Sequence, residues 1–291
     1  MRALLFPLWI PKDVPELIFF TTLSLYIEPE PPEEKTTATK TSEATTTEAE
    51  TTELVCQNGG TPLIESCKCP PQYSGRECER LVRDCSEVFE NGYTNASSDG
   101  FYFIQPITAP SPIKVRCQFA WDVGVTYTYY RPSDSDFNKN WTELKNGFGD
   151  PENNNYFIGL ENMHHVLRQG SYLLHIYFTH GNNIAGSAFY NNFAVASEAD
   201  FYRVSYDSFE TVPERPAENG FSSNEPVLFS APGQDTNGCA SSNGGESGWY
   251  GADCSTNNGL FASTLQWPVG CHLESLYMLE FNLMRQTPLY E

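Results

Sequence analysis

Cysteine is the residue type whose spacing in this sequence points most directly to chemistry. Four of the nine cysteines follow the pattern C-x10-C-x-C-x8-C, at Cys56, Cys67, Cys69 and Cys78. Structural zinc sites need paired C-x2-4-C ligands, which this spacing does not supply. Disulfides are favoured instead, because so short a segment buries little core and each bridge over a loop of about ten residues contributes roughly 2–3 kcal/mol.

No catalytic pattern accompanies the cysteines. The segment Gly245–Gly248 lacks the G-x-S-x-G spacing of a nucleophile elbow, and there is no glycine-rich phosphate loop. None of the histidines belongs to an H-E-x-x-H zinc motif; they are His164, His165, His175, His180 and His272. The sequence therefore predicts a protein that is not an enzyme.

The charge balance narrows the range of partners. The 291 residues include 17 Lys and Arg against 37 Asp and Glu, which gives a formal net charge of −20. Such a polyanion repels phosphate backbones, so nucleic-acid binding is not expected. No run reaches about 18 consecutive apolar residues, the length that predicts a membrane span. The 21 Gly, 20 Pro and 14% aromatic residues are typical of a turn-rich domain with many short strands.

The N-terminal part differs in composition from the rest of the chain. Residues 1–32 hold two apolar runs and are predicted to be a leader region, either a signal peptide or a short anchor. Residues 33–54 are a Thr- and Glu-rich linker, which has too few apolar side chains to bury a core. Such a tract serves either as an O-glycosylated stalk or as a bare spacer.

The elements expected after residue 84 are short and mixed. Apolar residues at three- and four-residue spacing predict helices over 137–148 and 161–169, the second ending at Gly170. A strand is predicted from the alternating residues Tyr172, Leu174, Ile176 and Phe178. Short helices combined with many short strands indicate the α+β class.

The segments Cys56–Thr61 and Cys67–Glu79 together resemble an epidermal growth factor-like module. That family has six cysteines paired 1–3, 2–4 and 5–6. The first and third positions, which are partners, lack cysteine here, and Pro62 stands where the third is expected. The resemblance therefore implies a four-cysteine module over residues 55–80 with the disulfides Cys56–Cys67 and Cys69–Cys78. It implies no calcium here, since the calcium-binding variant needs acidic residues before its first cysteine.

The remainder, residues 84–291, resembles a fibrinogen C-terminal-like domain. Five blocks carry the resemblance, namely Asp84–Tyr93, Asp136–Gly149, Phe157–Leu174, Cys239–Phe261 and Trp267. The resemblance implies an α+β domain with short helices and a mixed or antiparallel sheet, and the disulfides Cys85–Cys117 and Cys239–Cys254. Cys271 is then the ninth, unpaired cysteine, which forms either a bridge to a second copy, giving a disulfide-linked homodimer, or a buried free thiol.

Many members of the resembled family bind calcium in a D-x-D loop just before the second cysteine pair. When that loop is aligned on Cys239 without gaps, the two Asp positions become Ala231 and Gly233. Only Asp235 and Asn237 could then supply calcium ligands, in a shortened loop. Calcium binding there and a plain turn are the two interpretations.

The neighbouring pocket of the resembled family takes acetylated sugars or a peptide amine. It depends on a Cys-His step and on aromatic walls, but here Cys254 is followed by Ser255, and Gly251 stands where lectin members carry an aromatic residue. The candidate ligand-binding residues are Trp249, Tyr250 and Ser255. The two aromatic side chains either stack on a ligand or fill the core.

Two N-glycosylation sequons, at Asn95 and Asn140, join the cysteine pattern in favouring an oxidising, extracellular setting. The leading hypothesis is a secreted, non-enzymatic recognition protein of the fibrinogen-related lectin type, with a role in innate defence. It would bind glycans or other extracellular ligands through residues 215–271. The alternative is an extracellular matrix or signalling ligand that binds a cell-surface protein receptor.

Overall fold

The computed structural model describes residues 54–181, 184–221, 227–235, 237–255, 258–269 and 272–289, which fall in one compact unit. The predicted leader 1–32, all of the predicted linker except Leu54, and Cys271 lie outside the described residues. Within the described ranges, no helix has the length and apolar composition needed to cross a bilayer.

Two disulfides hold the four-cysteine segment. It contains two short antiparallel hairpins, β1 (Thr61–Pro62) with β2 (Cys67–Lys68) and β3 (Tyr73–Ser74) with β4 (Arg80–Leu81). The bridges join Cys56 to Cys67 and Cys69 to Cys78, the pairing implied by the growth-factor-like resemblance. The sulfurs themselves form the buried cluster of the segment, so covalent closure takes the place of a larger apolar core.

The segment is hydrogen-bonded to the helix that follows it, α1 (Cys85–Glu90). The Glu87 carboxylate accepts from Ser74 Oγ at 2.8 Å and from Arg80 Nη1 at 3.0 Å. Burial acts to raise the pKa of Glu87, but the hydrogen bonds from Arg80, Arg83 N–H and Ser74 outweigh it and hold the pKa below its usual value. Tyr93 donates its hydroxyl to the Cys69 carbonyl at 2.8 Å.

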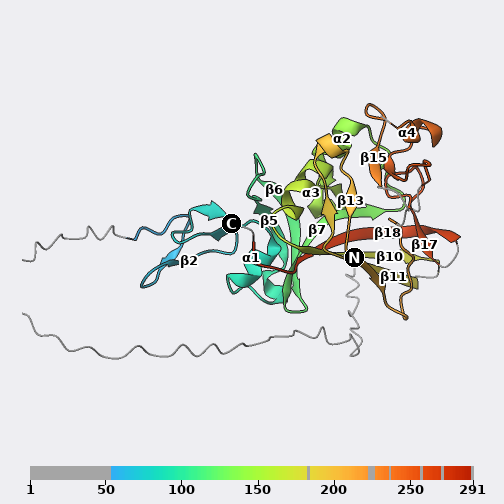
Figure 1. The fold of residues 1–291 in the computed structure, drawn as a ribbon. Coiled ribbons are helices and arrows are strands. Elements are labelled where there is room, and N and C mark those ends of the chain that lie inside the picture. The colour runs from blue at the N-terminus through green and yellow to red at the C-terminus, as the bar shows by residue number, and fades with distance from the viewer. Residues whose placement is uncertain are drawn as a thin grey trace, which may run out of the picture. The chain divides into compact units, whose positions relative to one another are not determined.

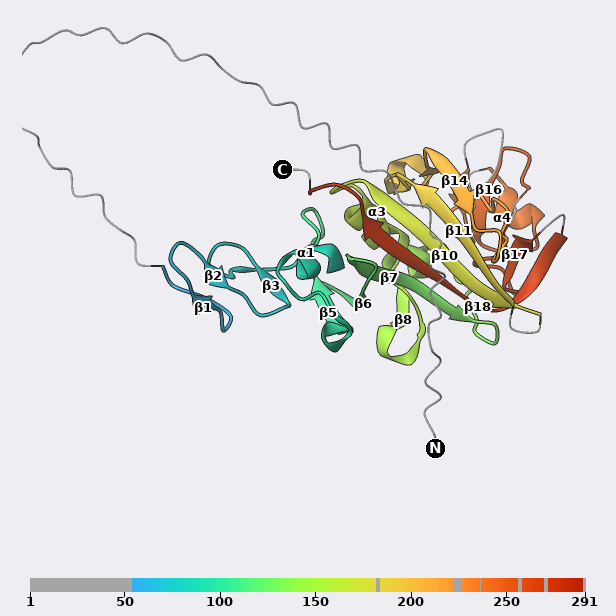
Figure 2. The same cartoon turned by 90° about the horizontal axis from the view of Figure 1, so that it is seen from below.

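The main sheet is antiparallel throughout, in the order β14-β11-β10-β18-β7-β6-β5 (Figures 1 and 2). Its strands are β5 (Gly100–Ile104), β6 (Ile113–Ala120), β7 (Val123–Pro132), β10 (Tyr172–His180), β11 (Ile184–Asn191), β14 (Ser208–Thr211) and β18 (His272–Arg285), with β8 (Phe148–Asp150), β9 (Asn155–Phe157) and β17 (Gln266–Val269) attached. Outside it, β12 (Ala194–Val195) pairs with β13 (Val204–Ser205), and β15 (Leu228–Ser230) pairs with β16 (Gly248–Tyr250). The last strand of the chain, β18, thus lies in the middle of the sheet.

Besides α1, the described helices are α2 (Trp141–Asn146), α3 (Leu160–Leu167) and α4 (Cys239–Ser242), with 3-10 turns at Ala96–Ser98, Pro151–Asn153 and Glu198–Asp200. Helices α2 and α3 lie on one side of the sheet (Figure 1). All are short, as the α+β prediction requires.

The helix predicted over 137–148 is too long at both ends. A capping box starts α2 late, because Asn140 Oδ1 accepts from Glu143 N–H at 3.1 Å and Glu143 Oε2 accepts from Asn140 N–H at 3.2 Å. The helix stops at Gly147, whose φ of 86° suits glycine and whose Cβ position lies 2.4 Å from the Ile158 carbonyl oxygen. The prediction over 161–169 locates α3 correctly, although the helix starts one residue earlier and ends at Leu167.

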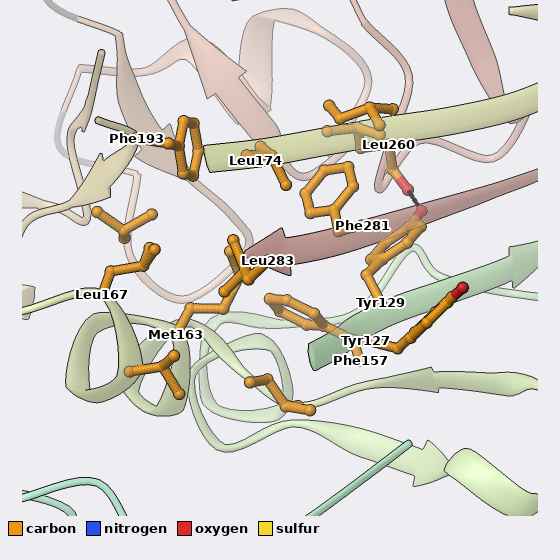
Figure 3. Close-up of a cluster of buried hydrophobic side chains, with 14 of the residues drawn as sticks. Tyr127, Tyr129, Phe157, Met163, Leu167, Leu174, Phe193, Leu260, Phe281 and Leu283 are labelled. Carbon is orange, nitrogen blue, oxygen red and sulfur yellow. Dashed lines mark hydrogen bonds between the residues drawn. The ribbon is translucent and has the colours of Figure 1, made fainter. Parts of the chain in front are cut away.

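The core lies between the sheet and α3. Along β10 the predicted alternation is present, with Tyr172, Leu174, Ile176 and Phe178 all buried. Figure 3 shows Leu174, Phe281 and Leu283 from the sheet next to Met163 of α3. Tyr129 stacks on Phe281 with ring centroids 4.9 Å apart, and each such buried side chain contributes roughly 1.5–3 kcal/mol.

A buried carboxylate joins the two ends of the larger domain. Asp84, fully buried, caps α1 by accepting from Glu87 N–H at 2.8 Å. Its other oxygen accepts from Arg285 Nε at 2.9 Å and from the Tyr172 hydroxyl at 2.6 Å. The Arg285 guanidinium also donates to Glu90 at 2.7 Å. Asp84, just before α1, therefore binds both Arg285 at the end of β18 and Tyr172 at the start of β10.

We predict that Asp84→Ala lowers the free energy of unfolding by about 3–5 kcal/mol, because it leaves the buried Arg285 guanidinium without its Asp84 partner and removes the cap of α1. Urea unfolding followed by tryptophan fluorescence measures the change. Asp136→Ala is the matched control, since it breaks an exposed ion pair with Lys139 and should change stability little. Equal losses in the two variants would contradict the role given to Asp84.

Candidate ligand-binding region

The predicted ligand-binding region lies around the disulfide Cys239–Cys254. This bridge closes a segment that includes α4 and β16, while β16 is held by its pairing with β15. The other disulfide of the domain, Cys85–Cys117, fastens α1 to β6. Both pairings are those that the fibrinogen-like resemblance implies.

Trp249 and Tyr250, the predicted ligand-stacking residues, fill the core instead. Both are at most 2% exposed. Trp249 donates Nε1–H to the Tyr202 carbonyl at 2.9 Å and packs edge-on against Phe229, with ring centroids 5.0 Å apart. The Tyr250 hydroxyl donates to the Glu246 carbonyl at 2.7 Å, and burial raises its pKa. Because strand β16 is buried along its whole length, neither ring offers a face to a ligand.

Asp235 and Asn237, the candidate calcium ligands, act as caps. The two Asp235 oxygens accept from Ala240 N–H at 2.9 Å and from Ser241 N–H at 2.8 Å, at the start of α4. Burial acts to raise the pKa of Asp235, but hydrogen bonds led by Ser241 outweigh it and lower the pKa. Asn237 Oδ1 accepts from Ser230 Oγ at 2.6 Å and from Cys239 N–H at 3.2 Å.

Calcium binding at Asp235 and Asn237 stays a prediction. Within the parts of the chain that the structure describes, no three His, Cys, Asp or Glu side chains come close enough together to hold a metal ion. Thr236, between the two candidate ligands, lies outside those parts. A calcium ion here would have to compete with backbone N–H groups for the Asp235 oxygens.

Ser255 is the one exposed member of the predicted ligand site. Its backbone N–H and its Oγ both donate to Asp253 Oδ1, at 2.9 and 2.6 Å. The Oγ hydrogen bond leads the causes that lower the Asp253 pKa. The stretch 215–271 contains no histidine, so no histidine of the predicted ligand region itself could act as a base for this hydroxyl.

Arg131, which no sequence motif identified, positions the loop after this region. Its side chain is fully buried on β7 and donates to the carbonyls of Leu260 and Ala262, both at 2.8 Å. The guanidinium also lies 5.2 Å from the Phe137 ring centroid. A charged residue near the end of a strand rich in valine and tyrosine was the only signal in the sequence. Its partners are carbonyls more than 120 residues away, so spacing could not identify them.

Both predicted glycosylation sites are exposed helix caps. Asn95 accepts from Ser97 N–H at 3.0 Å through Oδ1, and Asn140 caps α2 in the same way. An N-glycan is attached through Nδ2, so these Oδ1 caps are compatible with modification. Glycosylation itself stays a prediction.

A match to a sequence-family model identifies the family of this chain. The sequence model of the "Fibrinogen beta and gamma chains, C-terminal globular domain" family matches residues 81–272, more than half of the chain. The chain belongs to this family. Fibrinogen-like protein 1 of Bos taurus is 29% identical over 194 residues, covering 62% of this chain and 61% of that protein. The chain thus matches less than two thirds of that relative's length.

Solved structures have the same fold. The fibrinogen-like globe domain of human ANGPTL2 superposes with a TM-score of 0.61 at 22% identity, over 71% of this chain and 100% of the other. The lamprey fibrin D-dimer, solved in complex with the peptide ligand Gly-His-Arg-Pro-amide, superposes with a TM-score of 0.59 at 24% identity, over 70% of this chain and 73% of that one.

We predict that Asp235→Ala lowers the free energy of unfolding by about 1 kcal/mol in the presence of EDTA, because the lost interactions are caps that need no metal. Thermal unfolding with EDTA, and then with added calcium chloride, measures the effect. Asp253→Ala is the control, since Asp253 binds only the exposed Ser255 in the described contacts. A loss that appears only with calcium would identify Asp235 as a calcium ligand instead.

Proposed function

We propose that this protein is a secreted, non-enzymatic ligand whose fibrinogen-like domain binds an extracellular or cell-surface protein. The burial of Trp249 and Tyr250 carries the proposal, because it removes the aromatic surface on which a sugar ring would stack. Glycan binding is the leading hypothesis from the sequence, but this geometry favours its alternative.

The comparisons support a protein or peptide partner. The bovine relative is named a fibrinogen-like protein, and the lamprey fibrin structure holds a peptide ligand. A pocket that has lost its histidine step and its outer aromatic residue retains few groups with which to orient a sugar. Exposed polar side chains such as Ser255 suit the rim of a protein interface.

Secretion and the nature of the four-cysteine segment are part of the same proposal. Residues 55–80 are taken as a truncated epidermal growth factor-like module, which the two bridges and two hairpins support. Four disulfides in one chain favour an oxidising compartment. The sequons at Asn95 and Asn140, both exposed, are consistent with passage through the secretory route.

Two parallel measurements on the full-length secreted protein separate protein binding from glycan binding. We expect no retention on acetylated-sugar resin, with or without a chelator, and we expect proximity labelling on cells to identify a surface protein whose labelling competing sugar does not reduce. The labelling enzyme alone is the control. Retention on the resin that free sugar reverses would overturn the proposal in favour of a lectin.

The covalent state of the secreted protein gives a further prediction. We expect eight cysteines to resist alkylation until the protein is reduced, and peptide mapping to recover the four bridges described above, because each pair is already bonded. The mass before and after reduction reports whether Cys271 links two copies or remains a thiol. Alkylation of several cysteines without reduction would contradict an extracellular setting.

A further inference from the structure

The main sheet has a second face, directed away from α2 and α3. On β10 and β18 the residues Leu174, Phe281 and Leu283 point into the core (Figure 3). Since successive side chains of a strand point to opposite faces, the residues between them lie on the other side. In Figure 2 the strands β18, β10 and β11 lie on the viewer's side. We call this side the outer face; its central residues are Tyr130, His175, Tyr177, Phe189, Glu280 and Asn282.

Strand register places a carboxylate between two tyrosines at the centre of the outer face. Glu280 on β18 lies directly opposite Tyr177 of β10 and directly opposite Tyr130 of β7. Side chains paired in this way have Cβ atoms about 4.5–5.5 Å apart. All three residues are partly exposed, so this part of the outer face opens to solvent.

Beside this carboxylate, two buried polar side chains have unused hydrogen-bonding atoms. Asn282, 2% exposed, donates Nδ2–H to Glu280 Oε1 at 3.2 Å, while its Oδ1 has no hydrogen-bond partner. His175, the residue opposite Asn282 on β10, is 7% exposed and its Nδ1 also has none. A buried polar atom without a partner costs about 1–3 kcal/mol, so these two atoms oppose folding stability.

Two tyrosine rings on this side of the sheet each lie close to an arginine guanidinium. The Arg116 guanidinium lies 4.9 Å from the Tyr127 ring centroid, and the Arg215 guanidinium lies 6.0 Å from that of Tyr177. Among the described residues, however, neither arginine nor any other basic side chain forms an ion pair with Glu280. The carboxylate therefore lies between two aromatic rings and, among the described residues, has no basic side chain in direct contact with it.

We propose that the outer face binds a lysine side chain of the partner protein, whose ammonium group sits between Tyr130 and Tyr177 and donates hydrogen bonds to the Glu280 carboxylate. A compact ammonium with three donors matches acceptors on one strand flanked by two rings. The strongly acidic chain favours a basic partner during encounter. This inference rests on the proposed function, in that the partner is a protein.

The charge of the site depends on Glu280 alone near neutral pH. Burial raises the pKa of Glu280 to about 6, against the lowering effects of Asn282 and Arg116. Burial also raises the pKa values of Tyr130 and Tyr177 and lowers that of His175 to about 3, so these three stay neutral. The nearby Arg116 and Arg215 remain cationic. Lysine binding should therefore weaken as the pH falls through 6 and Glu280 loses its charge.

The test uses the tripeptide Ac-Ala-Lys-Ala-NH2 as the probe and the full-length, ¹⁵N-labelled protein. We expect saturable shifts of the Asn282 side-chain amide signal about one pH unit above 6, weaker binding about one unit below it, and no binding of Ac-Ala-Gln-Ala-NH2. Glu280→Gln should weaken binding roughly fivefold or more and remove its pH dependence. Glu214→Gln, the same charge change in an exposed loop, should leave binding unchanged.

Tyr177→Leu is a second variant that keeps the carboxylate, and it should also weaken lysine binding because one aromatic wall is lost. Equal shifts with the lysine and glutamine peptides, no shift at Asn282, or unchanged binding by Glu280→Gln would each overturn the inference. The tripeptide result decides this site without reference to the partner. The cell-labelling experiment decides the proposed function separately, so failure of one is distinguishable from failure of the other.

Discussion

One buried carboxylate, that of Asp84, closes the larger domain. It caps α1, accepts the Tyr172 hydroxyl and pairs with Arg285 at the end of β18. Because β18 runs through the middle of the sheet, fixing its end fixes the register of β10 and β7 on either side. Two charges buried together are stabilised only when they are fully paired, and Glu90 adds a second carboxylate partner for Arg285. Asp84 therefore ties the start of α1 to the two central strands β10 and β18.

Packing of the core also determines which side chains of the predicted ligand region are available to bind a ligand. Trp249 packs among aromatic rings, and Arg131 donates hydrogen bonds to carbonyls of the following loop. A ring that contributes to core packing cannot also stack on a ligand without a loss of several kcal/mol. The loop region therefore presents capped backbone, hydroxyls and carboxylates such as Asp253, which suit a polar protein rim better than a sugar pocket.

The two faces of the main sheet differ in the side chains they carry. The inner face is apolar and continuous with α3 (Figure 3), whereas the outer face places Glu280, Asn282 and His175 side by side among aromatic rings. Unpartnered polar atoms and a carboxylate with a raised pKa oppose folding stability. Their presence on a strand that otherwise packs well is typical of a surface shaped by binding.

The sequence by itself determined the local features. Cysteine spacing predicted disulfides, and the family resemblance implied which cysteines pair and what fold surrounds them. Alternation predicted β10, and apolar residues at three- and four-residue spacing predicted two short helices. These are set by loop closure and by periodicity over a few residues. Only the tertiary structure decided that Trp249 and Tyr250 are core, that Asp235 is a cap, and that Glu280 lies between Tyr130 and Tyr177. Burial and cross-strand register depend on pairings between distant segments, and no local pattern encodes them.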